Sequence, residues 1–364
     1  MKSTCVTFLK GLIDYAGLFP PARLTLDATL ENFLSYRAGS FAWMLGRLIL
    51  PAPRIDELLA ALAALAGPGP GPGIEGGPLP LALIVGVGTT ENEALNTVGV
   101  ELSSALDAIE AVGGESSPEV AIEVLETRFP LETVDTSDSS AALAYVQSLC
   151  GAVESLLSGR TWGPTTGRRR RGLELFLEIP ASAAGYPLGA TPLVAALAQM
   201  NKNLAAYPGP SSLKRLGFKL RSGGLEPQAF PSAQQTALLI ATCQNLQVPM
   251  KCTAGLHHPI RHHDEASGVT MHGFFNVFGA GILAHALNIP EETIEACIED
   301  QNPKSFSFSD RAFVWQDLQV TREQAATSRA EFMTSFGSCS FVEPLDDLMA
   351  LGLIDRPAPG ATGC

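Results

Sequence analysis

One stretch of the chain carries a complete strand–helix–strand unit, residues 217–253, which read GFKLRSGGLEPQAFPSAQQTALLIATCQNLQVPMKCT. The segments Gly217–Leu220 and Val248–Thr253 are short apolar runs of the kind that form buried strands. Ala233–Leu246, between them, has apolar residues at helical spacing. Because parallel strands need a long crossover connection, this order predicts a βαβ unit.

The same alternation of short apolar runs and helical patterns continues from the N-terminus to about residue 290. Eight strands are predicted, at Phe8–Leu12, Arg47–Leu50, Leu79–Val87, Val120–Leu125, Leu173–Ile179, Gly217–Leu220, Val248–Thr253 and Phe274–Phe278. Eight successive units favour a closed (β/α)8 TIM barrel. An open doubly wound sheet is the main alternative, although no glycine-rich dinucleotide fingerprint follows the first strand.

The remaining segments define the expected domain organisation. The barrel is expected to occupy residues 1–287, with a Gly/Pro-rich loop insertion at 67–78 and a second insertion at 158–172 that contains Arg168–Arg171. Residues 288–356 are expected to form a C-terminal helical extension packed on the barrel. Residues 357–364 are expected to be a disordered tail.

Composition excludes several function classes. The chain has 364 residues and a net charge of −13, from 24 Lys and Arg against 37 Asp and Glu, which argues against a nucleic-acid or membrane-surface partner. No apolar run approaches the ~20 residues of a membrane span. Seven scattered cysteines without a CxxC pair indicate reduced thiols and a cytoplasmic location. The expected partner is a small anionic molecule, and the sequence leaves open whether identical chains assemble.

Two of the chain's seven lysines lie inside predicted neighbouring strands. Strand periodicity places Lys219 and Arg221 on one face, and likewise Lys251 and Thr253. If both faces point into the barrel, two amines and a guanidinium converge. Buried cations need partners or shifted pKa values.

Carboxylates are available at corresponding heights. Glu126 and Glu178 end the predicted fourth and fifth strands, and Asp14 follows the first strand. Active sites of this fold lie at the C-terminal ends of the strands. These acids are therefore expected either to assist the lysines in catalysis or to form a structural layer of ion pairs.

The first mechanistic hypothesis is Schiff-base chemistry. A lysine that is desolvated beside a second cation has a lowered pKa, so its neutral amine can attack a carbonyl. Lys219 and Lys251 supply such a pair. Glu126 or Glu178 would then move the proton.

The motifs Lys219-Leu-Arg-Ser-Gly-Gly224 and Lys251-Cys-Thr-Ala-Gly255 resemble those of the deoxyribose-phosphate aldolase type of class I aldolase. That family carries a nucleophilic lysine on strand six and a second lysine on strand seven of its barrel. The resemblance implies a lyase for a small anionic carbonyl or phosphorylated compound, with Lys219 as nucleophile and Lys251 as its pKa-lowering partner. It covers residues 217–255 and departs from the family at Leu220 and Arg221, in the loop that follows and in the C-terminal extension.

All six histidines lie between residues 257 and 285, and four of them fall in the run HHPIRHH, residues 257–263. This loop follows the seventh predicted strand, at the catalytic face of a barrel. A second hypothesis is therefore a metal-dependent lyase, hydrolase or isomerase that binds Zn²⁺ or Mn²⁺, although HExxH is absent. Its ligands would be His257, His258, His262 and His263.

The main expectation is that the chain needs no metal or other cofactor. The same loop would then bind a carboxylate or phosphate. The expected substrate-binding residues are Asp14, Arg221, Ser222, Gly223, Gly224, Thr253, Gly255, His257, His258, Arg261 and Asn276. A third hypothesis is a non-catalytic, metabolite-binding barrel whose buried charges pair among themselves. Cys339 is a further candidate nucleophile, but no histidine is near it in sequence, and a small buried thiol is the commoner role.

Overall fold

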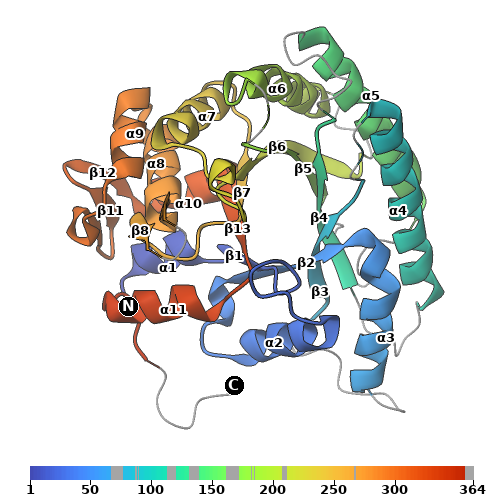
Figure 1. The fold of residues 1–364 in the computed structure, drawn as a ribbon, viewed down its shortest axis with the longest axis horizontal. Coiled ribbons are helices and arrows are strands. Elements are labelled where there is room, and N and C mark those ends of the chain that lie inside the picture. The colour runs from blue at the N-terminus through green and yellow to red at the C-terminus, as the bar shows by residue number, and fades with distance from the viewer. Residues whose placement is uncertain are drawn as a thin grey trace.

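The computed structural model describes residues 1–66, 77–86, 88, 90–112, 120–130, 139–160, 172–181, 183, 185–206, 211–265 and 268–356. Its centre is a closed barrel of eight parallel strands in the order β1-β13-β7-β6-β5-β4-β3-β2 (Figure 1), which confirms the predicted (β/α)8 TIM barrel. The barrel strands are β1 (Ile13–Tyr15), β2 (Leu45–Pro51), β3 (Leu79–Ile84), β4 (Val120–Arg128), β5 (Leu173–Ile179), β6 (Leu213–Arg221), β7 (Met250–Thr253) and β13 (Met333–Ser338).

Helices surround the barrel and cover the outer faces of its strands (Figure 1). They are α2 (Leu26–Ala38), α3 (Ile55–Ala66), α4 (Glu91–Ala111), α5 (Ser139–Leu157), α6 (Thr191–Ala206), α7 (Ala233–Asn245), α8 (Phe274–Leu287) and α11 (Val342–Ala350). Among the described helices, α5 alone has the length and hydropathy of a membrane span. It packs between α4 and α6 and buries Ala142, Val146, Leu149 and Val153 at helical spacing, as a core helix does.

The eighth barrel strand is not where the sequence predicts it. The run Phe274–Phe278 begins α8, whereas β13, far along the chain, closes the barrel. Between them lie two helices and a three-stranded sheet. The helices are α9 (Glu291–Glu299) and α10 (Arg322–Glu331), and the sheet consists of β10 (Phe306–Phe308), β11 (Ala312–Trp315) and β12 (Leu318–Thr321). The predicted barrel boundary at residue 287 is therefore wrong, because the region 288–356 supplies a barrel strand as well as helices.

Close packing explains the two glycines within α8. A Cβ at Gly281 would lie 2.5 Å from the Met333 side chain, and one at Gly279 would lie 3.0 Å from Phe313. The helix thus packs tightly against the start of β13 and against β11. The prediction of a strand at Phe8–Leu12 is also wrong, since α1 (Ser3–Leu9) occupies most of it and β1 begins only at Ile13.

A buried arginine joins the N-terminal region to the last barrel strand. The Arg329 guanidinium donates to the carbonyl oxygens of Phe8 at 2.8 Å and Lys10 at 3.1 Å, and also to those of Met333 and Thr334. Burial lowers the pKa of Arg329 to about 9. Four carbonyl acceptors satisfy a group that would otherwise be costly to bury.

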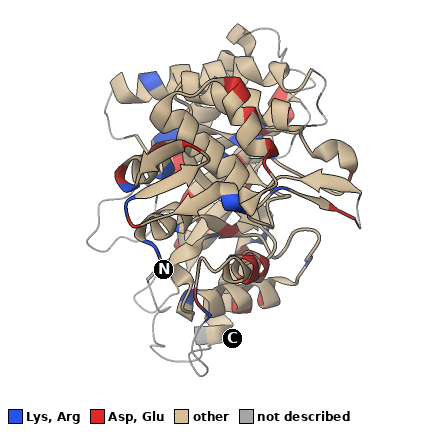
Figure 2. Cartoon of the chain, turned by 90° about the vertical axis from the view of Figure 1, so that its left-hand side faces the viewer, with Lys and Arg blue, Asp and Glu red and all other residues tan. Residues whose placement is uncertain are grey.

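The predicted insertions and tail fall mainly on residues 67–76, 161–171 and 357–364, which lie outside the described residues, as does Arg168–Arg171. Figure 2 shows Lys and Arg positions interspersed with Asp and Glu positions along the described chain.

Candidate active site

Two buried lysines occupy matching positions on neighbouring strands. Lys219 on β6 is the register partner of Lys251 on β7, and the two residues are 5% and 0% exposed. Both ammonium groups contact Glu126 on β4: Nζ of Lys219 lies 2.6 Å from Oε2, and Nζ of Lys251 lies 2.7 Å from Oε1. The predicted convergence of the two amines is therefore present, with a carboxylate between them.

Further ion pairs extend this cluster in both directions. Lys219 Nζ lies 3.0 Å from Glu178 Oε2, and Glu178 Oε1 accepts a hydrogen bond from Arg221 Nε at 2.6 Å. At the other end Lys251 binds Asp14. We call this set of alternating charges the charge cluster; it consists of Asp14, Lys251, Glu126, Lys219, Glu178 and Arg221. Its three negative and three positive charges cancel.

Electrostatics keep the carboxylates of the charge cluster ionised. Burial would raise the pKa of Glu126, but the ammonium groups of Lys219 and Lys251 outweigh it and lower that pKa to about 2. Burial is likewise outweighed at Glu178, where Lys219 and Arg221 lower the pKa to about 2. Buried charges persist only when paired in this way.

The pKa of Lys219 moves against the sequence-based prediction. Burial lowers it, but the carboxylates of Glu126 and Glu178 outweigh burial and raise it above its ordinary value. The predicted lowering by a second cation is therefore wrong for the resting arrangement, because the two amines are separated by an acid. Lys219 rests as an ammonium ion.

Glycines make room for the polar interior of the barrel. A Cβ at Gly46 would lie 2.2 Å from Asp14 Oδ1, which also accepts a hydrogen bond from the backbone N–H of Arg47 at 2.7 Å. Gly337 on β13 faces Thr253, and a Cβ there would lie 3.2 Å from the threonine hydroxyl. Larger residues at these points would displace the acid or the end of β7.

Part of the barrel interior is apolar, including the positions two residues before Glu126 on β4 and Glu178 on β5. Ile49, Ala82, Val124, Phe176 and Ala16 form a separate buried cluster, against which the partly buried Phe19 and Ile84 pack. Phe19 belongs to the connection between β1 and α2, which Figure 1 shows beside the ends of β1 and β2.

The predicted glycine turns pack the loops after β6 and β7 against each other. Gly255 has φ +72°, and a Cβ there would lie 2.6 Å from the carbonyl oxygen of Ser222. A Cβ at Gly223 would lie 2.8 Å from the Cα of Gly255, and one at Gly224 would lie 2.6 Å from Ala229 Cβ. The Ser222 N–H donates to the Thr253 carbonyl at 2.9 Å. These residues hold the two lysine-bearing strands together at their C-terminal ends.

The histidine loop takes separate partners instead of forming one site. His257 Nδ1 lies 3.0 Å from Glu343 Oε2 and His258 Nδ1 lies 2.6 Å from Asp347 Oδ2, so both contact α11. On β8 (His262–Asp264), which pairs with β9 (Val269–Met271), the two histidines contact Ile260 and Thr270. Across the described residues, no three His, Cys, Asp or Glu side chains are placed to hold a metal ion. Of the alternative ligand set, His258 and His262 lie against each other with ring centroids 4.4 Å apart, but the set is not gathered around one point.

Two predicted binding residues support the loop. Asn276 Oδ1 accepts from the Arg261 N–H at 2.7 Å, and Asn276 Nδ2 donates to the carbonyls of Cys297 and Asp300 at 2.9 and 2.7 Å. The Arg261 guanidinium lies 2.7 Å from Nδ1 of the buried His272. These contacts use the polar atoms of Asn276 to hold the loop to α8 and to the end of α9.

Sequence reasoning missed three members of the site. Ser335 donates its hydroxyl to Asp14 Oδ2 at 2.7 Å. Arg47 lies 3.8 Å from Asp14 Oδ1, and Arg128 Nε lies 3.8 Å from Glu178 Oε1. Ser335 was hidden because its strand lies within residues 288–356, which the sequence predicts as a C-terminal helical extension. Arg128 lies at the last position of β4, two residues after Glu126, so strand periodicity could have found it.

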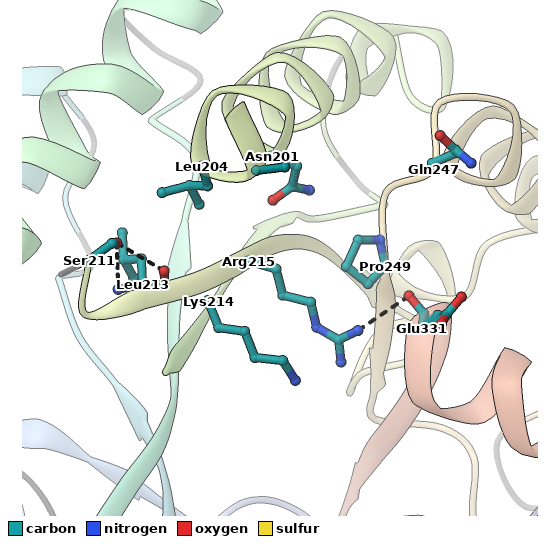
Figure 3. A pocket seen from close by; sticks show the side chains of 10 residues that line it. Asn201, Leu204, Ser211, Leu213, Lys214, Arg215, Gln247, Pro249 and Glu331 are labelled. Carbon is teal, nitrogen blue, oxygen red and sulfur yellow. Dashed lines mark hydrogen bonds between the residues drawn. The ribbon is translucent and has the colours of Figure 1, made fainter. Parts of the chain in front are cut away.

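A hollow of about 350 Å³ lies at the other end of β6 and is shown in Figure 3. Lys214, Arg215 and Glu331 line it, and Arg215 donates to the carbonyl oxygens of Ala330 and Glu331. Lys214 and Arg215 lie near the start of β6, whereas Lys219 lies near its end, so this hollow is separate from the charge cluster. The N-terminal ends of barrel strands ordinarily contribute to stability.

Neither a scan against protein-family models nor a search of curated proteins matched this chain.

Proposed function

We propose that this chain is a lyase of the class I aldolase type, which acts on a small anionic carbonyl or phosphorylated compound through a Schiff base on Lys219. The observation that carries the proposal is the pair of buried lysines bridged by Glu126 near the C-terminal ends of β6 and β7. Perturbed, desolvated charges at this end of a barrel are characteristic of catalytic sites.

Position favours Lys219 over Lys251 as the nucleophile. The Lys251 ammonium is enclosed by Asp14 and Glu126, and its side chain is only 1% exposed. Lys219 instead shares Glu178 with Arg221 and Arg128, whose side chains are 25% and 47% exposed. A substrate from solvent would therefore meet these arginines and then Lys219.

The arginines offer a way to activate the resting ammonium. A phosphate or carboxylate that binds Arg221 would compete with Glu178 for the guanidinium. Because Arg221 is one of the groups that lower the pKa of Glu178, its withdrawal would raise that pKa. Glu178, 3.0 Å from Lys219 Nζ, would then accept the ammonium proton.

The freed amine would attack the substrate carbonyl carbon, and the resulting carbinolamine would lose water to give a protonated imine. That cation accepts the electron pair of the bond between the next two carbons as it breaks, and the hydroxyl on the departing carbon loses its proton to become a carbonyl. The enamine left on Lys219 then takes up a proton, and water hydrolyses the imine to release the second product. Glu126, in contact with both lysines, is placed to move protons during formation and hydrolysis of the imine. No cofactor is required, and a cytoplasmic location is expected.

Borohydride trapping tests the proposal. Pyruvate, glyoxylate and glycolaldehyde phosphate would each be incubated with the protein and borohydride, and the intact mass measured. We expect an irreversible adduct of one substrate per chain that is absent in Lys219→Met. Lys214→Met is the matched control, because Lys214 lies on the same strand, with its side chain 53% exposed. Equal labelling of both variants would refute the proposal.

A non-catalytic metabolite-binding barrel is the second candidate, and one observation favours it. Every charge in the cluster is paired with another member, as expected for a structural layer of ions. Such a protein would bind one of these anions reversibly, with no borohydride adduct and no released product. Calorimetric binding together with trapping separates the two functions.

A further inference from the structure

A cysteine, a histidine and a glutamate meet where the chain leaves β7 and β13. Cys339 Sγ lies 3.9 Å from His257 Nε2, and His257 Nδ1 lies 3.0 Å from Glu343 Oε2. The two ring nitrogens thus face a thiol on one side and a carboxylate on the other. This arrangement is that of a nucleophile, its base and the acid that orients the base.

Three elements place these groups together. Gly337 on β13 pairs with Thr253 on β7, so the segments that follow the two strands begin side by side. Cys339 comes directly after β13, and the Ser340 N–H donates to Ser338 Oγ, which fixes the turn around the thiol. Glu343 lies in the first turn of α11.

We propose that Cys339, His257 and Glu343 form a second reactive centre, in which the thiol attacks the carbonyl carbon of an activated acyl group such as a thioester or activated ester. Glu343 accepts the Nδ1 hydrogen of His257, which leaves the Nε2 lone pair directed at the sulfur. Nothing in the charge cluster takes part, so this centre is independent of the Schiff-base proposal.

Each step of the reaction balances. His257 Nε2 takes the thiol proton as the sulfur attacks, the new carbon–sulfur bond forms, and the leaving alcohol or thiol departs with that proton. Water, deprotonated by His257, then attacks the enzyme thioester, which releases the free acid and restores the thiol. The base is needed because burial raises the pKa of the Cys339 thiol. A hydrogen bond from the Ala22 backbone lowers this pKa and the charge of Glu343 raises it, and the pKa stays above its ordinary value.

The structure supplies a matched control one residue along the chain. His258 also contacts an acid of α11, Asp347, at 2.6 Å, but its ring stacks edge-on against His262 and not on a thiol. A loss of reactivity in His257→Gln that is absent in His258→Gln would therefore come from the thiol contact. A general loosening of the loop would affect both variants.

The test uses p-nitrophenyl acetate with the full chain in a Cys364→Ser background, followed by release of p-nitrophenolate and by peptide mapping. We expect acetylation of Cys339, lost in Cys339→Ser, lowered roughly 100-fold in His257→Gln and retained in His258→Gln. Retention in Lys219→Met would separate this centre from the lysines, whatever borohydride trapping shows. The proposal is overturned if Cys339 stays unmodified, or if the two histidine variants behave alike.

Discussion

Replacing Glu126 with glutamine removes the charge that joins the two lysines. Glu126 is 1% exposed, so solvent does not screen its ion pairs. Its pKa of about 2, against an ordinary value of 4.5, corresponds to about 3 kcal/mol in favour of the ionised form. Removal of one partner from a buried pair ordinarily costs about 3–5 kcal/mol. We therefore expect Glu126→Gln to lower the free energy of unfolding at pH 7 by about 3 kcal/mol or more.

The control for this variant is Glu123→Gln, on the same strand. Glu123 binds Arg47 at 3.0 Å but its side chain is 31% exposed, so its loss is expected to cost about 1 kcal/mol or less. Urea unfolding, followed by circular dichroism, measures both variants. Equal effects of the two substitutions would refute the argument that burial makes the Glu126 pairs strong.

The pH dependence has a definite sign. Because folding lowers the pKa of Glu126, its contribution is present above pH 4.5 and disappears as pH falls toward 2. Stability of the wild-type protein should therefore fall steeply over that range. The loss should be shallower in Glu126→Gln, and an unchanged slope would contradict the assigned ionisation.

Three further predictions concern the loops and the rim. Burial and Arg261 lower the pKa of His272 to about 4, so the protein should lose stability from pH 6.5 to 4; His272→Gln should flatten that part of a urea-unfolding series. Gly255→Ala should cost at least about 2 kcal/mol in the same assay, because φ is +72° and the new methyl would meet the Ser222 carbonyl. Arg221→Gln should weaken the borohydride adduct of glycolaldehyde phosphate at least about tenfold while leaving that of acetaldehyde largely unchanged, measured by intact mass.

The sequence predicted the strands whose apolar runs are bounded by turns. Leu173–Ile179 coincides with β5, and the predicted lysine-bearing segments lie on β6 and β7. Strand periodicity shows which side chains share a face of a strand, and in this fold the C-terminal strand ends carry the active site. These two rules made it possible to predict the two lysines, Glu126, Glu178 and Asp14 as site residues. Their close contact required only that the barrel close.

The failures have equally physical causes. The β13 strand turns the polar Ser335 toward Asp14, so its inner face carries no hydrophobic signal. A short apolar run such as Phe274–Phe278 fits a buried helix as well as a strand. The contact of Cys339 with His257 joins segments 82 residues apart, and no local pattern encodes it. The direction of the Lys219 pKa depends on which charge lies nearest, which only the folded barrel determines.

The most direct test of the central claim is peptide mapping of the chain after borohydride reduction with glycolaldehyde phosphate. The account predicts a single reduced adduct on the peptide that carries Lys219, and none on Lys251 or Lys214. An adduct on Lys251 would contradict the assigned nucleophile. Absence of any adduct, with the anion still bound reversibly, would contradict Schiff-base chemistry and leave the charge cluster as a binding site.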